Sequence, residues 1–138
     1  MKKIEIPMFY TLVFYIEGNI NQIDKQTKHI MKKYGFINAK KSPQPMTEHT
    51  NGRCIYLLKD LDKPNIGGGN YSKAIIIAFN TEACQLKVKG ADVRKLKIST
   101  VCHEIRHLVD KIIEGHKVFD VETPAYLTGW ISAELLAD

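Results

Sequence analysis

Several features that mark well-defined protein classes are scarce in this chain of 138 residues. Its three cysteines, Cys54, Cys84 and Cys102, are too few and too scattered for a disulfide framework, and no Cys-x-x-Cys spacing suggests a second metal site. No apolar run reaches the roughly 20 residues that a membrane-spanning helix needs. No internal repeat or low-complexity segment occurs. These absences favour a cytoplasmic protein that has no membrane partner.

An N-terminal apolar run, residues 8–16, follows Met1-Lys2-Lys3 in the manner of a signal peptide. Glu5, Pro7 and Glu17 break that pattern, and no small-x-small cleavage site follows the run. Aromatic and β-branched side chains dominate the run, and such side chains are typical of strands. We therefore predict a strand over residues 8–16 rather than a targeting segment.

What is present fits one compact α+β domain over residues 1–138. Hydrophobic residues make up 44% of the chain and charged residues 25%, which is enough to bury a modest core. Apolar spacing predicts a helix over residues 19–34 that ends at Gly35. Strands are predicted at residues 36–39, 53–58 and 74–79, and loops at residues 42–51 and 60–70. The expected architecture is a small mixed sheet with one N-terminal helix and two C-terminal helices.

The most informative motif is His103-Glu104-Ile105-Arg106-His107, because two histidines four residues apart share one face of a helix. Such a pair binds one zinc ion together, and a catalytic zinc lowers the pKa of a bound water to roughly 7. Glu104 is then placed to take the proton of that water. The plainer alternative is a solvated polar face that also carries Arg106, Lys111 and Glu114.

A helix over about residues 99–114 is expected to carry this motif. Ser99 or Thr100 is a suitable cap at its start, and Gly115 is suited to a left-handed stop at its end. At about 100° per residue, the two histidines and Asp110 form one stripe, and an apolar stripe lies on the far side. The apolar stripe consists of Val101, Ile105, Leu108 and Ile112. We therefore expect the apolar face of this helix to pack against the core and the opposite face to bind the metal.

A catalytic zinc needs a third protein ligand, and the best candidate is Glu122. It opens the segment 122–130, whose proline suits a helix start and whose apolar residues follow at helical spacing. A helix that returns toward the motif would bring this carboxylate to the histidines. Asp110 and His116 are the competing ligands, although Asp110 stands about 10 Å along the axis from His103. That distance better suits an acceptor for the free ring N–H of a ligand histidine.

A hydroxyl group for the same site is expected on the returning helix. Tyr126 lies one helical turn beyond Glu122 and is a candidate donor of a hydrogen bond to an oxyanion in the cleft. A tyrosine buried in the core is the alternative interpretation of this residue.

The run from His103 to Trp130 resembles the zincin metallopeptidases, in the gluzincin arrangement where a glutamate on the next helix follows His-Glu-x-x-His. It is similar to compact zincins of bacteriophages and mobile elements, and more distantly to ImmA/IrrE-like and SprT-like peptidases. The resemblance implies a minimal zincin-like fold in which His103, His107 and Glu122 bind zinc and Glu104 is the base and proton shuttle. It also implies hydrolysis of peptide bonds in a protein substrate, in a bacterial cell or a phage-infected host. In zincins an edge strand pairs with the extended substrate, and residues 71–80 are expected to serve in this way.

The formal net charge of +5 raises a different class of function, because clustered lysines attract phosphate backbones. The clusters are Lys25, Lys28 and Lys32 on one predicted helical face, and Lys87, Lys89, Arg94, Lys95 and Lys97 before the motif helix. No recognised nucleic-acid motif interleaves them, so an ordinary solvated basic surface is the simpler interpretation. The sequence thus leaves three hypotheses: a zinc metallopeptidase, an inactive zincin fold used as a binding or inhibitory module, and a basic nucleic-acid-binding protein.

Overall fold

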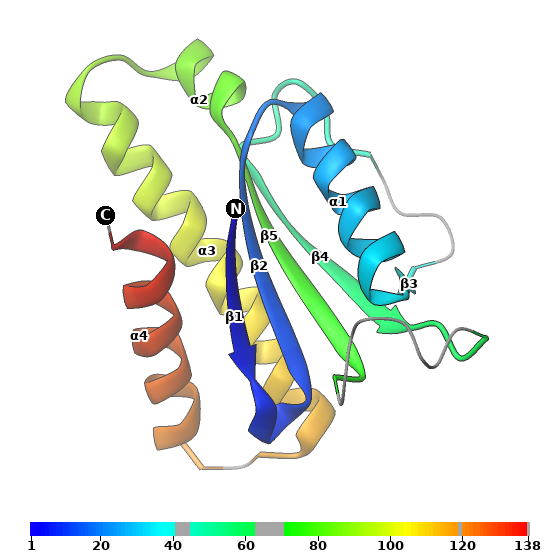
Figure 1. Cartoon of the computed structure of the whole chain (residues 1–138). Helices are drawn as coiled ribbons and strands as arrows, with labels where there is room; N and C mark the ends of the chain where they lie inside the picture. The colour runs from blue at the N-terminus through cyan, green and yellow to red at the C-terminus, as the bar shows by residue number, and fades with distance from the viewer. Residues whose placement is uncertain (41–44, 63–70, 119, 138) are drawn as a thin grey trace.

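The computed structural model describes residues 1–40, 45–62, 71–118 and 120–137 (Figure 1). Its described strands form one sheet in the order β1-β2-β5-β4-β3. The elements are β1 (Lys2–Ile6), a 3₁₀ turn η1 (Pro7–Phe9), β2 (Thr11–Gly18), α1 (Ile20–Tyr34), β3 (Phe36–Asn38), β4 (Gly52–Lys59), β5 (Lys73–Asn80), α2 (Thr81–Lys87), α3 (Ala91–His116) and α4 (Glu122–Leu136). The predicted α+β class is confirmed.

The central strands β2 and β5 run parallel, and the other neighbouring strands pair antiparallel. Both central strands are apolar along nearly their whole length because helices cover both faces of the sheet. Leu12, Phe14 and Ile16 point to the face covered by α1, whereas Val13 and Tyr15 pack with residues of α3 and α4. The sheet therefore separates two cores, and α3 lies over β4 and β5 on its own side.

The helix predicted over residues 19–34 is confirmed as α1. Asn19 and Gln22 form a reciprocal capping box at its start, in which each side chain accepts a hydrogen bond from the backbone N–H of the other. Gly35 ends the helix in the left-handed region with φ 70°. The strands predicted at residues 36–39, 53–58 and 74–79 are also present, as β3, β4 and β5.

The predicted N-terminal strand is displaced, and a neighbouring strand was missed. β2 runs over Thr11–Gly18, whereas Pro7–Phe9 form the 3₁₀ turn that joins it to β1. Proline fixes the backbone at the start of this turn, and Tyr10 reverses the chain with φ 51°. The predicted loop at 42–51 is seen only from residue 45, and most of the predicted loop at 60–70 lies outside the described residues.

The motif helix α3 is longer than predicted at both ends. It begins at Ala91, after Gly90 with φ 63°, so Ser99 and Thr100 are interior residues and not caps. Val93 and Leu96 pack against the α3-side core and extend the apolar stripe toward the N-terminus, which explains the earlier start. The predicted stop at Gly115 is also wrong, because the left-handed residue is Lys117 with φ 52°.

The expectation that residues 71–80 form a substrate-binding edge strand is wrong. β5 hydrogen-bonds to β2 on one side and to β4 on the other, so neither of its edges is open. A continuous apolar strand is buried on both faces, which places it in the middle of a sheet rather than at its edge. On its other side β4 pairs with β3, which contacts its Leu57–Lys59 end.

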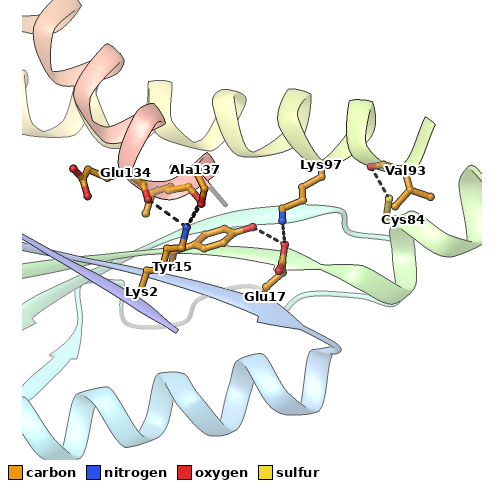
Figure 2. Close-up of polar contacts among 9 residues, drawn as sticks. Lys2, Tyr15, Glu17, Cys84, Val93, Lys97, Glu134 and Ala137 are labelled. Atoms are coloured by element: carbon orange, nitrogen blue, oxygen red, sulfur yellow. Dashed lines mark hydrogen bonds and ion pairs between the residues drawn. The ribbon is translucent and has the colours of Figure 1, made fainter. Parts of the chain in front are cut away.

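The position of α4 is set by contacts with the first strand. Leu127, Ile131 and Leu135 pack with Ile4 and Ile6 in the α3-side core. Lys2 Nζ donates hydrogen bonds to the carbonyls of Leu135 (3.1 Å) and Ala137 (2.7 Å) at the end of α4 (Figure 2). Cations suit this end of a helix because its last carbonyls lack partners within the helix. α4 therefore lies beside α3 on the β1 side, away from β4 (Figure 1).

Among the described residues, no helix combines the length and the apolar character required to cross a bilayer.

Candidate metal centre

His103 and His107 lie together on the exposed face of α3, one helical turn apart. Their Nε2 atoms are 3.1 Å apart, and their ring centroids are 4.7 Å apart with the ring planes at 81°. The predicted stripe is confirmed, since Val101, Ile105 and Leu108 on the far side are fully buried. The helix thus brings two imidazole nitrogens close together on one exposed face.

The spacing of these nitrogens fits two ligands of one tetrahedral metal ion. Zinc–nitrogen bonds of about 2.0–2.1 Å at a tetrahedral angle separate two ligand nitrogens by about 3.3 Å. The observed distance is 3.1 Å, which is also a hydrogen-bond distance. A small side-chain rotation is enough to bring it to the value expected for two zinc ligands. The spacing of the pair is therefore compatible with two of the three protein ligands that a catalytic zinc needs.

Glu104 lies between the histidines in sequence but differs from them in burial. Glu104 is only 8% exposed, and its Cγ lies close to β4, 3.4 Å from where a Cβ atom on Gly52 would be. Burial raises the pKa of this carboxyl group above its usual range, while His103, His107 and Arg53 act in the opposite direction. A carboxylate with a raised pKa is a better proton acceptor near neutral pH.

A cavity of about 880 Å³ opens beside Glu104 and His107. It extends along β4 from Gly52 to Tyr56 and reaches the side of α1 on the other face of the sheet, at Ile23 and Thr27. Pocket volumes in this range accommodate a drug-sized molecule or a short length of peptide. The candidate base and one candidate metal ligand therefore face a space that is large enough for a substrate.

Two residues of this cavity carry no sequence motif and were missed. The side chains of successive residues of β4 point to opposite faces of the sheet. Those of Cys54 and Tyr56 point to the face that α3 covers, and both residues line the cavity. Burial raises the pKa of Cys54 to about 12. Burial also raises the pKa of Tyr56, and the neighbouring Cys54 and Glu104 raise it further. The hydroxyl of Tyr56 donates a hydrogen bond of 3.5 Å to the carbonyl of His107.

Glu122, the predicted third ligand, is not brought to the histidines. The described residues contain no group of three or more His, Cys, Asp or Glu side chains that could hold a metal ion. Glu122 opens α4 beyond the last turn of α3, and the stretch of α3 from His107 to His116 is itself roughly 13 Å long. The returning helix also packs on the β1 side of α3, whereas the cavity lies over β4.

The competing ligands are engaged elsewhere. Asp110 accepts a hydrogen bond from Nε of Arg106 at 3.2 Å, so its carboxylate pairs with arginine one turn away rather than with a histidine ring. His116 lies at the far end of α3, where its Nε2 is 2.8 Å from Nζ of Lys73 and its ring contacts Phe9. Desolvation and the adjacent Lys73 lower the pKa of His116.

Tyr126, the predicted oxyanion donor, is 76% exposed and does not line the cavity. The alternative interpretation of Tyr126 as a buried core residue is wrong, because its side chain is exposed. It stands on α4, on the β1 side of α3, so the hydroxyl group nearest to the motif within the cavity is that of Tyr56.

The basic residues before the motif are partly used in structural contacts. Lys97 forms an ion pair with Glu17, which also accepts a hydrogen bond from Tyr15 (Figure 2). Lys87 Nζ donates to the carbonyl of His49 and to Asn51 Oδ1, both at 2.6 Å. These contacts hold α2 and α3 to the sheet and to the segment before β4. The predicted nucleic-acid contact gains no support from them.

Thiol reactivity provides a direct check on this arrangement. Cys102 is exposed on α3, whereas Cys84 is buried and Cys54 lies against α3. Burial raises the pKa of both Cys54 and Cys84, so little reactive thiolate forms at these positions near pH 8. We expect one fast-reacting thiol with 5,5′-dithiobis(2-nitrobenzoate) in the native protein and three in guanidinium chloride. The variant Cys102→Ser should lose the fast reaction, and a second fast thiol in that variant would contradict the burial of Cys54 and Cys84.

Comparison of the chain with protein-family models, with curated proteins and with solved structures found no match.

Proposed function

We propose that this protein is a zinc-dependent metallopeptidase that hydrolyses peptide bonds in a protein substrate, with His103 and His107 as metal ligands and Glu104 as the base. The observation that carries the proposal is the 3.1 Å separation of the two Nε2 atoms beside a buried carboxyl group that faces a cavity. A solvated polar face gives no reason for Glu104 to be buried.

The residues around the cavity match the needs of this reaction. A zinc ion held by the two histidines would supply Lewis acidity, which polarises a carbonyl group and makes water more acidic. Glu104 would accept the proton of the attacking water and deliver it to the leaving nitrogen.

A zinc-binding module without catalytic activity is the second candidate. It is favoured by the distance of Glu122 from the histidines, because a catalytic zinc has three protein ligands and the described residues supply two. The role of Glu122 as the third zinc ligand therefore stays a prediction, and it requires the start of α4 to move toward the motif. Metal binding is common to both candidates, and peptide hydrolysis separates them.

The metal site is tested by measuring the zinc content of purified protein and its zinc affinity against a chromophoric chelator. We expect about one zinc per chain, and a loss of affinity of at least roughly 100-fold in His103→Ala and in His107→Ala. Glu122→Ala should keep its zinc, because its carboxylate begins α4 beyond the end of α3. Asp110→Ala is the matched control on the same helix. Unchanged zinc affinity in both histidine variants would overturn the proposal, and zinc loss in Glu122→Ala would show that α4 rearranges.

A further inference from the structure

The side chain of Tyr56 enters the candidate site from the sheet rather than from the motif helix. Successive residues of a strand point to opposite faces, so Ile55 packs with the core beneath α1 and Tyr56 packs with the core beneath α3. The register of β4 against β5 sets this orientation, with Tyr56 opposite Ile75. Tyr56 lines the same cavity as Glu104 and His107.

The hydroxyl of Tyr56 is held at the motif by two weak hydrogen bonds, one to the carbonyl of His107 and one with the sulfur of Cys54. Its donation to the carbonyl of His107 spans 3.5 Å, which is at the outer limit for a hydroxyl donor, where the common distance is about 2.7–2.8 Å. The ring itself is fixed on the other side, because Nζ of Lys111 lies 5.3 Å from its centroid. A fixed ring with a weakly bonded hydroxyl can offer its proton to a better acceptor without rearranging the site.

We infer that Tyr56 is a further catalytic residue, whose hydroxyl donates a hydrogen bond to the carbonyl oxygen of the peptide bond that is cleaved. This inference rests on the proposed peptidase function. The water oxygen bonds to the carbonyl carbon, the carbon–oxygen double bond becomes a single bond to an oxyanion, and the proton released from water moves to Glu104. When the carbon–nitrogen bond breaks, that proton passes to the leaving nitrogen and the carbonyl double bond re-forms. Tyr56 neither gains nor loses a proton, and its hydrogen bond strengthens while the oxyanion exists.

The geometry that supports Tyr56 distinguishes it from Tyr126, which the sequence suggested for the same role. Tyr126 stands on α4 on the β1 side of α3, and its side chain is directed to solvent. The hydroxyl of Tyr56 contacts the carbonyl of His107 on α3. Glu104 lies about one helical turn before His107, and Lys111, which contacts the Tyr56 ring, lies about one turn after it. Tyr56 therefore lines the cavity beside the base, with its hydroxyl at the backbone of the motif helix.

The test compares Tyr56→Phe with Tyr126→Phe in zinc-loaded protein, using quenched fluorescent casein as substrate. Tyr56→Phe keeps the ring and its contact with Lys111, so its melting temperature and zinc affinity should equal those of the wild type. We expect kcat to fall by roughly 100-fold while KM changes by less than about threefold, because the donor acts on the oxyanion more than on the bound substrate. Affinity for a phosphinic peptide, which mimics the tetrahedral intermediate, should fall by a similar factor. Tyr10→Phe, at an exposed residue beside His116, should match the wild type in every measurement.

The outcomes separate this inference from the proposed function. If the wild type binds zinc and cleaves casein but Tyr56→Phe retains its kcat, the inference about Tyr56 is overturned and the peptidase proposal stands. A change confined to KM, a loss of zinc affinity in Tyr56→Phe, or a fall in kcat in Tyr126→Phe alone would overturn it equally. If the wild type with bound zinc cleaves no substrate, the peptidase proposal itself fails and this inference fails with it.

Discussion

Glu104→Gln is expected to lower the rate of casein hydrolysis by roughly 10²–10⁴-fold while the protein keeps its zinc. The amide has almost the same size and shape as the carboxyl group, so the cavity and the two histidines should keep their geometry. It cannot accept a proton from water at neutral pH, which removes the base from the reaction. Steady-state hydrolysis and metal content, measured on the same preparation, check both parts of this expectation.

The free energy of unfolding gives this variant a second readout. Glu104 is buried, and a carboxylate loses hydration when it is buried. A neutral amide of the same shape avoids part of that cost, so metal-free Glu104→Gln should be at least as stable as the wild type in urea. Glu114→Gln, at an exposed position of the same helix, is the matched control and should change neither hydrolysis nor zinc content. Full activity in Glu104→Gln would remove Glu104 from the role of base.

Local patterns predicted the parts of the fold that depend on neighbouring residues. The start and stop of α1 are encoded by Asn19, Gln22 and Gly35, which act on the backbone within one turn. The convergence of His103 and His107 was predictable in the same way, since four residues place two side chains on one helical face. Such features follow from the geometry of a single element and need no knowledge of the rest of the chain.

The features that sequence patterns did not predict depend on contacts between distant segments. Tyr56 reaches the motif only because β4 pairs with β5 in a particular register and α3 lies across that pair. Glu122 was expected at the histidines because a helix that returns toward the motif would bring it there, but a returning helix can pack on either side of the first. Lys2, at the other end of the sequence, holds α4 on the β1 side. The apolar periodicity of α4 does not specify on which side of α3 it packs, because the same apolar stripe could face the core from either side.

The contact between α3 and β4 that positions Glu104 depends on the absence of a side chain at residue 52. A Cβ atom added to Gly52 would lie 2.6 Å from Cγ2 of Thr100, 3.1 Å from the carbonyl oxygen of Ala78 and 3.4 Å from Cγ of Glu104. Thr100 is β-branched and lies inside α3, so its methyl group has little freedom to move aside. The helix or the strand must shift to relieve this overlap.

Gly52→Ala is therefore expected to lower the free energy of unfolding by about 1–3 kcal/mol, which corresponds to a melting temperature lower by roughly 5–10 °C. Gly129→Ala is the matched control, because a Cβ there meets no atom within 4 Å and the residue lies inside α4. Alanine is the better helix former, so this control should gain roughly 0.5–1 kcal/mol.

A double-mutant cycle with Thr100→Ala identifies the cause of the expected destabilisation. Removing the methyl group of Thr100 leaves the 3.1 Å approach to the Ala78 carbonyl, so the double variant should recover a large part of the stability lost in Gly52→Ala, but not all of it. Urea denaturation of the four proteins measures this coupling. Additive effects of the two substitutions would mean that α3 does not approach β4 at Gly52, and the placement of Glu104 in the cavity would then lose its structural basis.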